Sequence, residues 1–405
     1  MAMNEMTISQ ASTLLNAMVK QATGQTAQTT INTPADLVSV AQTALKTGKD
    51  PLFNVISQVW SDTIFATRPY NAPLKSLEWN MAKYGNAIRK LSPVAAGMVD
   101  DESYKYPVAF DSAQSGEELG NGKSVDMWKI NKQDVLQTNF YGTAVYQQYY
   151  TVFRKQLMVA FNTADELMRY NAMMLQERLN DKESYKEAVA RGLQLNFIAG
   201  IIDEAQATRV VHLLTEYNAL TGLTLDQQTV FQPENYPAFI RWLYSRINNL
   251  CDLMAERSNV YQTNITGKTI LRHTAKNNLR AAINSNFWEQ MKTMALPVTF
   301  GADRLTTTPN FDSVTYWQSI DSPMAIDITP VYTGTDGAVK TGSQVTEQMV
   351  VGIIHDVDAI GYAQVDPWSS VTPLNSAGGY WNEYYHASYK TVSDNTEKAI
   401  VLLLD

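Results

Sequence analysis

A glycine-rich segment comes closest to a motif that could bind phosphate. Residues 116–124 have the sequence Gly-Glu-Glu-Leu-Gly-Asn-Gly-Lys-Ser. A P-loop has a glycine separated by four residues from its Gly-Lys-Ser, so that backbone N–H groups can cradle phosphate oxygens. That position is Glu117 here, two carboxylates would face the phosphates, and no apolar helix follows. We therefore interpret the segment as a polar loop rather than a nucleotide site.

The second candidate is the pair Asp356 and Asp358, which follows His355. Carboxylate oxygens at this spacing suit a hard divalent cation, as in the Asp-x-Asp site of a sugar-nucleotide enzyme. The flanking residues, Met349 to Ile354 and Ala359 to Val365, have the composition of two strands, and Asp is a frequent turn residue. We expect a hairpin turn here and no metal, and we keep a metal-dependent glycosyltransferase as an alternative function.

The remaining reactive side chains form no catalytic constellation. The four histidines are scattered, and no Gly-x-Ser-x-Gly nucleophile turn is present. The single cysteine, Cys251, excludes an intrachain disulfide and lies in an apolar helical stripe, where we expect an inert buried thiol. The sequence thus predicts no catalytic residue, no cofactor and no enzymatic activity.

Composition excludes several classes of protein. Of 405 residues, 45% are hydrophobic and only 18% are charged, against about 25% in a typical soluble domain. The formal net charge of −8 is too small for intrinsic disorder, and it argues against a broad basic face for nucleic acid. The apolar runs, such as residues 400–404, are too short to span a membrane, and residues 1–20 show no secretory signal.

The N-terminal part of the chain reads as an arm followed by β-type segments. Amphipathic spacing predicts helices over 8–20 and 51–65, with a polar extended stretch at 21–34 between them. Residues 84–125 are rich in glycine and predict a long protruding loop or hairpin rather than packed core. Short strands are expected at 105–110 and 127–130, and a long one at 135–153.

Helical patterns dominate the middle of the chain. A capping box at Thr163 predicts a helix that runs to about Leu195, with its Asp and Glu residues at 165–187 on a solvated face. Further helices are expected at 203–220, ending before Gly222, from Pro237 onward, and at 274–288.

Strands return at the C-terminus, over 380–389 and 398–404. Two tyrosine-rich clusters lie around Tyr146 to Tyr150 and Tyr380 to Tyr389, and basic residues are too few there for base stacking, so we expect core and subunit-interface packing. Helices and strands are mixed without regular β-α-β alternation, which predicts an α+β fold.

At this end the sequence resembles a known family. The stretch Gly379 to His386, the polar spacer and the strand Ala399 to Leu403 resemble the end of the major capsid protein of small short-tailed phages of the phi-29 type. The strand pair 350–365 and the order of parts, which is arm, β-loop, long capped helix and mixed domain, occupy corresponding places.

The resemblance implies the Hong Kong 97 capsid fold, with five regions. Residues 1–67 would form an N-terminal arm with helices, and residues 68–150 an extended E-loop with P-domain strands. Residues 151–224 would form a P-domain whose spine helix starts at Thr163, and residues 225–370 an A-domain. Residues 371–405 would form C-terminal strands that return to the P-domain.

The function that the resemblance implies is that of a major capsid protein of a tailed double-stranded DNA bacteriophage. Copies would form hexamers and pentamers of an icosahedral head, with a scaffolding protein and a portal as partners, and would enclose DNA without specific binding or membrane contact. The expected location is the virion capsid, reached through the host cytoplasm during assembly. An encapsulin-type compartment shell is the alternative with the same fold. The candidate subunit-interface residues are Lys83, Arg89, Lys90, Lys105, Glu117, Glu118 and Lys123.

Overall fold

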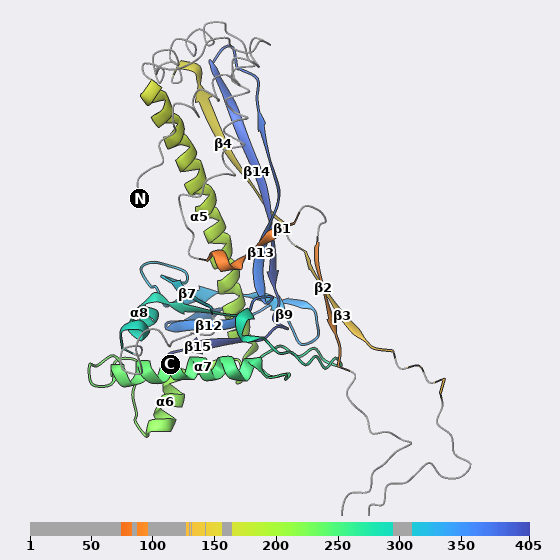
Figure 1. Ribbon diagram of the computed structural model, residues 1–405, viewed down its shortest axis with the longest axis vertical. Coiled ribbons are helices and arrows are strands. Elements are labelled where there is room, and N and C mark those ends of the chain that lie inside the picture. Colours follow the sequence, from red (N-terminus) through yellow and green to blue (C-terminus); the bar gives the residue numbers. More distant parts are fainter. Residues whose placement is uncertain are drawn as a thin grey trace, which may run out of the picture.

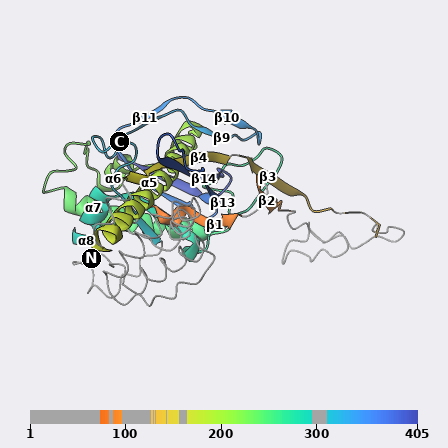
Figure 2. The same ribbon diagram turned by 90° about the horizontal axis from the view of Figure 1, so that it is seen from above.

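The structure, a computed structural model, has two sheets, a long helix that connects them, and a two-stranded hairpin that leaves the body (Figures 1 and 2). It describes residues 74–82, 87–95, 127–128, 130, 132–141, 143–155, 164–294 and 310–405. The mixture of helices and strands without β-α-β alternation confirms the α+β class. The helices expected at 8–20 and 51–65, the polar stretch 21–34 and the strand 105–110 lie outside the described residues.

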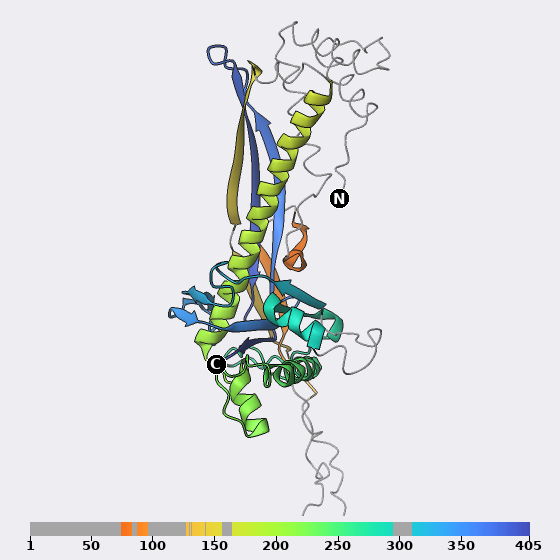
Figure 3. The ribbon, with the colours of Figure 1, turned by 90° about the vertical axis from the view of Figure 1, so that its left-hand side faces the viewer.

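The first sheet has four strands in the order β1-β13-β14-β4. β1 (Glu78–Ala82) runs parallel to β13 (Ile360–Val371), whereas β14 (Tyr380–Ser393) is antiparallel to β13 and to β4 (Thr143–Phe153). Burial alternates with period two along β14, as expected for a strand with one covered face. α5 (Ala164–Glu204) covers that face (Figure 3). The strand expected at 380–389 is confirmed. The single long strand expected at 135–153 was wrong, because this stretch forms two strands, β3 (Val135–Tyr141) and β4, which belong to different sheets.

α5 is longer than the sequence pattern indicated. The expected end near Leu195 was wrong, because the helix continues to Glu204. Its last turns enter the core between the two sheets, where Phe197, Ile198 and Ile201 have no exposed surface. A helix surrounded by core is apolar on every side, so the amphipathic period that marked its first half is lost.

The first half of α5 also differs from the expectation of a solvated charged face. Arg178, Glu183 and Lys186 are buried against the four-stranded sheet. The guanidinium of Arg178 lies 4.2 Å from the ring centre of Tyr150, and Lys186 Nζ lies 2.8 Å from Glu78 Oε1. The expectation was wrong at these positions because long cationic side chains can cover aromatic rings while their charged groups find partners.

The second sheet is shorter and mixed, in the order β5-β15-β12-β6-β7. Its strands are β5 (Val210–His212), β15 (Ala399–Leu403), β12 (Val350–Asp356), β6 (Leu279–Asn284) and β7 (Asn310–Val314). Every residue of β12 and β15 is buried, as expected for strands covered on both faces.

Strands β12 and β13 were expected to form a hairpin, and this was wrong. They are joined by a tight turn in which Ala359 N–H donates to the carbonyl of Asp356 at 3.0 Å, yet they pair in different sheets. The C-terminal strands divide in the same way, since β14 belongs to the four-stranded sheet and β15 to the five-stranded one. Residues 371–405 therefore do not return to one sheet. At both turns the chain passes from one sheet to the other.

Three helices pack against the second sheet, at the lower left of Figure 1. They are α6 (Leu213–Thr221), α7 (Tyr236–Ala255) and α8 (Ser285–Met294). The helix start at Pro237 and the stop at Gly222, whose φ is 73°, are confirmed. The helix expected at 203–220 begins only at Leu213, and the one expected at 274–288 is replaced by β6 followed by α8. Both windows contain a short buried strand, whose apolar run resembles a buried helix segment in sequence.

Short elements complete the body. β9 (Val331–Thr333) and β10 (Val339–Thr341) form a small hairpin, and the strands that flank it, β8 (Ile326–Ile328) and β11 (Val345–Glu347), also pair antiparallel. Two 3-10 turns are η1 (Lys75–Leu77) and η2 (Lys276–Asn278). The β9 hairpin is held to the end of α5, because Tyr332 Oη donates to Asp203 at 2.6 Å. Cys251 is buried in α7, as expected. Among the described residues, we find no helix that combines the length and apolar character needed to cross a bilayer.

Candidate subunit interface

The hairpin arm consists of β2 (Ala87–Pro93) and β3 (Val135–Tyr141), which pair antiparallel, and no third strand from the described part of the chain joins them. It leaves the body beside the four-stranded sheet and extends away from both sheets (Figure 2). Beyond β3, Met127 and Trp128 lie in a turn, so the strand expected over 127–130 was wrong at these two residues. A two-stranded hairpin alone is marginally stable in water, so the arm depends on contacts at its base or with another surface.

One face of the arm is open to solvent and partly apolar. Alternate residues of β3 are exposed, and Val135 and Tyr141 are 48% and 76% exposed. Leu91 of β2, which is 57% exposed, lies on the same face, together with Arg89. Farther along, Met127, Trp128 and Ile130 are each more than 80% exposed. The described residues of the arm therefore include apolar side chains that are open to solvent.

Among the described residues, side chains on the face of the four-stranded sheet opposite α5 are also exposed. Trp368 on β13 stacks on His386 of β14 with ring centres 4.0 Å apart, and Tyr149 on β4 is 72% exposed. By the strand register, this face of β4 and β14 carries Val145, Gln147, Tyr149, Thr151, Phe153, Tyr380, Asn382, Tyr384, His386 and Ser388. None of these is Asp, Glu, Lys or Arg, and Lys390, the next residue of β14 in this register, is only 3% exposed. An uncharged surface rich in aromatic residues is typical of the centre of a protein interface.

The tyrosines on the covered face of this sheet belong to the core. The rings of Tyr146 and Tyr389 are stacked with their centres 5.6 Å apart, and Tyr185 of α5 stacks on Tyr146 at 4.0 Å. Burial raises the pKa of Tyr146 to about 12, so its hydroxyl stays protonated and pairs with that of Tyr389 at 3.3 Å. This part of the tyrosine clusters packs in the core, as expected.

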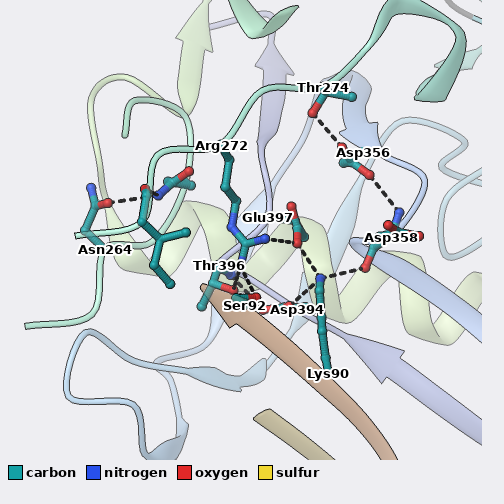
Figure 4. Close-up of polar contacts among 12 residues, drawn as sticks. Lys90, Ser92, Asn264, Arg272, Thr274, Asp356, Asp358, Asp394, Thr396 and Glu397 are labelled. Atoms are coloured by element: carbon teal, nitrogen blue, oxygen red, sulfur yellow. Dashed lines mark hydrogen bonds and ion pairs between the residues drawn. The ribbon is translucent and has the colours of Figure 1, made fainter. Parts of the chain in front are cut away.

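Charged side chains meet where the inner face of the arm joins the body (Figure 4). Lys90 Nζ lies 2.8 Å from Asp394 Oδ2 and forms a second ion pair with Glu397. Arg272 pairs with the same Glu397 and donates to Ser92 Oγ of β2 at 3.2 Å. We call these five residues the arm-base cluster.

The cluster is largely shielded from water. The side chains of Asp394 and Glu397 are 2% and 8% exposed. Burial by itself would raise the pKa of Asp394, but Lys90 and the hydrogen bonds that the carboxylate accepts hold it below its usual value. Burial raises the pKa of Glu397 despite the opposing cations, and both carboxylates outweigh burial in raising the pKa of Lys90. The cluster thus contains two cations and two carboxylates, whose charges compensate one another.

Two of the candidate interface residues, Arg89 and Lys90, lie in the described part of the chain. They are neighbours on β2 with opposite orientations, since Arg89 is exposed and Lys90 pairs within its own chain. Arg89 remains a predicted interface residue. The other candidates, Lys83, Lys105, Glu117, Glu118 and Lys123, lie outside the described residues, as does the glycine-rich segment 116–124.

Sequence reasoning missed the other members of the arm-base cluster, Ser92, Arg272, Asp394 and Glu397. Asp394 and Glu397 are in a polar turn, 394–398, between two apolar strands, and that pattern is available in the sequence. Their pairing with Lys90 joins residues about three hundred positions apart, which no local pattern indicates.

Asp356 and Asp358 form hydrogen bonds within and beside the turn that joins the two sheets. Asp356 accepts hydrogen bonds from Thr274 Oγ1 at 2.6 Å and from Asp358 N–H at 2.9 Å. Within the described ranges, no group of three or more His, Cys, Asp or Glu side chains is arranged to hold a metal ion. The turn expected at these residues is present, and the glycosyltransferase alternative gains no support from this geometry.

Comparison with known proteins gives a family match over almost the whole chain. The family model of the Phi29-like phage major capsid protein matches residues 15–403. The capsid structure of Staphylococcus phage Andhra is similar, with a TM-score of 0.51 and 12% identity over 81% of this chain and 83% of that one. A structure of head fiber and inner core protein gp22 of bacteriophage P68 has a TM-score of 0.49 and 11% identity over 81% and 83%. No curated protein matches the chain.

Proposed function

The chain belongs to the Phi29-like phage major capsid protein family, and from this premise we propose that its copies form hexamers and pentamers of an icosahedral head. The protein is a major capsid protein of a tailed phage, with the Hong Kong 97 type of capsid fold that the sequence resemblance implied. The proposal extends this identity to the arrangement of copies in the shell and to the surfaces that join them.

The hairpin arm is the observation that carries the assembly proposal. It is a two-stranded element with a solvent-facing apolar side, formed by Leu91, Val135 and Tyr141. Exposed apolar groups of this kind are stabilised when another surface removes them from water. In a shell built from copies of one chain, the surface of a neighbouring subunit fits this requirement. The uncharged outer face of the four-stranded sheet supports the same view.

The low and negative net charge supports a container rather than a DNA-binding protein. With a formal charge of −8, the chain lacks the excess of cations that tight phosphate binding needs. We therefore propose that the head encloses double-stranded DNA without specific binding and acts without enzymatic activity. Assembly takes place in the host cytoplasm, with a scaffolding protein and a portal as partners.

We keep the order of the five capsid-fold regions in this proposal, and we place their boundaries where the chain passes between the two sheets. The E-loop corresponds to the arm and residues 96–126, and the spine helix to α5. The A-domain would hold the five-stranded sheet, including β15, and the P-domain the four-stranded sheet. The turn at 356–359, where the chain changes sheets, supports an A-domain boundary there rather than at residue 370.

Co-expression with the phage's scaffolding protein, followed by electron microscopy, tests the proposal. We expect closed shells from the natural chain. Leu91→Ser combined with Val135→Ser should leave the subunit folded but prevent closed shells, because the apolar face of the arm is lost. Leu253→Ser, at an exposed leucine on α7, is the control and should assemble. A strictly monomeric natural chain would refute the proposal, and normal shells from the double variant would refute the role of the arm.

A further inference from the structure

The arm-base cluster joins the arm to three separate segments of the body. Lys90 reaches the turn 394–398 and also the carbonyl of Asp358, at 3.4 Å. Arg272 lies on the segment 258–275 that connects α7 to β6, and it bonds to Ser92 of the arm as well as to Glu397. Segments far apart in the sequence therefore converge on two neighbouring positions of one face of β2 (Figure 4).

The body side of this junction is held by its own hydrogen bonds. Asp394 accepts hydrogen bonds from Thr396 N–H at 2.9 Å and from Thr396 Oγ1 at 2.6 Å. The backbone of the turn is bonded to both neighbouring segments, since Asp394 N–H donates to Ala359 at 2.8 Å and Thr263 N–H donates to Asn395 at 2.9 Å. The carboxylates that Lys90 meets are thus held in place before the arm contributes anything.

The same connecting segment, 258–275, also contacts the arm at a second place. Ala95 N–H donates to the carbonyl of Thr269 at 2.9 Å, and Lys268 Nζ lies 3.1 Å from Asp134 Oδ2 at the start of β3. These contacts are more exposed than the arm-base cluster. Because the arm-base cluster and these contacts lie at two places along the β2–β3 pair, together they restrict rotation as well as translation of the arm.

Charges make this junction selective for one arrangement. Apolar contacts keep most of their free energy when two surfaces slide or tilt, whereas a buried charge that leaves its partner keeps its desolvation cost. Two cations and two shielded carboxylates can all be paired in few geometries. We propose that Lys90 and Ser92, together with Arg272, Asp394 and Glu397, form a joint that sets the direction of the arm relative to the body.

Lys90 in this role is a positioning residue within the subunit rather than a contact between subunits. The joint itself is a property of one chain. Its consequence, that a correctly aimed arm meets the neighbouring copy, rests on the proposed function.

Distance measurements on the unassembled full chain test the joint. Spin labels on Asn139→Cys of the arm and Ser184→Cys of α5 report the arm direction, and Cys251 is buried, so it stays unlabelled. We expect a narrow distance distribution in the otherwise natural chain and a broad or shifted one after Lys90→Met. Arg89→Met is the matched control, because the same change on the opposite face of β2 should leave the distribution narrow.

A second variant keeps the test decisive if Lys90→Met does not fold. Lys90→Gln combined with Glu397→Gln removes one charge of each sign while preserving side-chain size, and it should also broaden the distribution. Lys90→Arg should restore a narrow one. An unchanged narrow distribution in the folded Lys90→Met or paired Gln variant would overturn the proposal. Shell formation is scored separately, so failure of the natural chain to assemble would count against the proposed function and not against the joint.

Discussion

Arg178 on α5 and Glu383 on β14 form an ion pair, with Arg178 Nη2 2.8 Å from Glu383 Oε2, although both side chains are only 7% exposed. Arg178 also covers the ring of Tyr150, and Trp381 Nε1 donates to Glu383 at 3.3 Å. The pair therefore fixes the helix on the sheet through charge and ring contacts rather than through aliphatic packing.

Removing one partner of this ion pair should lower the free energy of unfolding. Arg178→Met leaves Glu383 as a shielded carboxylate without its counter-ion, and breaking a buried pair in this way destabilises by about 3–5 kcal/mol. Arg178→Met combined with Glu383→Gln should recover part of that loss, because no charge is then left unpaired. Urea unfolding measures both variants. A single variant as stable as the natural chain would show that the pair contributes nothing.

Alanine substitutions at two glycines in different surroundings should change the free energy of unfolding in opposite directions. A Cβ on Gly352, in the centre of β12, would lie 2.7 Å from the carbonyl oxygen of Ala282, so Gly352→Ala should destabilise by about 1–3 kcal/mol. A Cβ on Gly192 of α5 meets nothing within 4 Å, so Gly192→Ala should stabilise by about 0.5–1 kcal/mol. Thermal unfolding compares the two, and equal effects would contradict the close approach at Gly352.

His355 should make the protein less stable as the pH falls. It is fully shielded in β12, and burial lowers its pKa from 6.5 to about 4. Below pH 6.5 the unfolded chain gains a proton that the folded chain does not accept until about pH 4. The free energy of unfolding should therefore fall by about 2 kcal/mol between pH 7.5 and 5 through this group alone.

His355→Gln isolates that contribution. The variant is less stable at neutral pH if its new side chain fits poorly, but its stability should vary less between pH 7.5 and 5 than that of the natural chain. Denaturant unfolding at a series of pH values gives both slopes. Identical slopes would mean that His355 is protonated in the folded state.

Lys398 should stabilise the end of α7. Its side chain is fully buried, and its Nζ donates to the carbonyl of Met254 at 3.0 Å, to Ser258 Oγ at 3.1 Å and to the carbonyl of Glu256. Lys398→Met removes these three hydrogen bonds, which should cost about 2–3 kcal/mol and speed hydrogen exchange in the last turn of α7. Lys292→Met, at an exposed lysine in the last turn of α8, is the matched control and should change stability by less than about 0.5 kcal/mol. Equal losses in the two variants would contradict a specific role for Lys398.

The sequence by itself determined the elements whose signals are local. The apolar stripe after Pro237, the stop at Gly222, the tyrosine-rich strand β14 and the turn at 356–358 are all found where the pattern placed them. The C-terminal stretch from Gly379 to His386 was specific enough to indicate the family. Each of these signals depends on residues within a few positions of one another.

Only the tertiary structure decided which strands pair and which charges are buried. β12 and β13 follow one another through a tight turn yet belong to different sheets, because β13 pairs with β1 and with the next strand, β14, whereas β12 lies between β6 and β15. Arg178 and Lys90 look like surface charges until Glu383 and Asp394, more than two hundred residues away, supply the buried counter-charges. Pairing and desolvation depend on contacts made after the chain has folded, so no local spacing could indicate them.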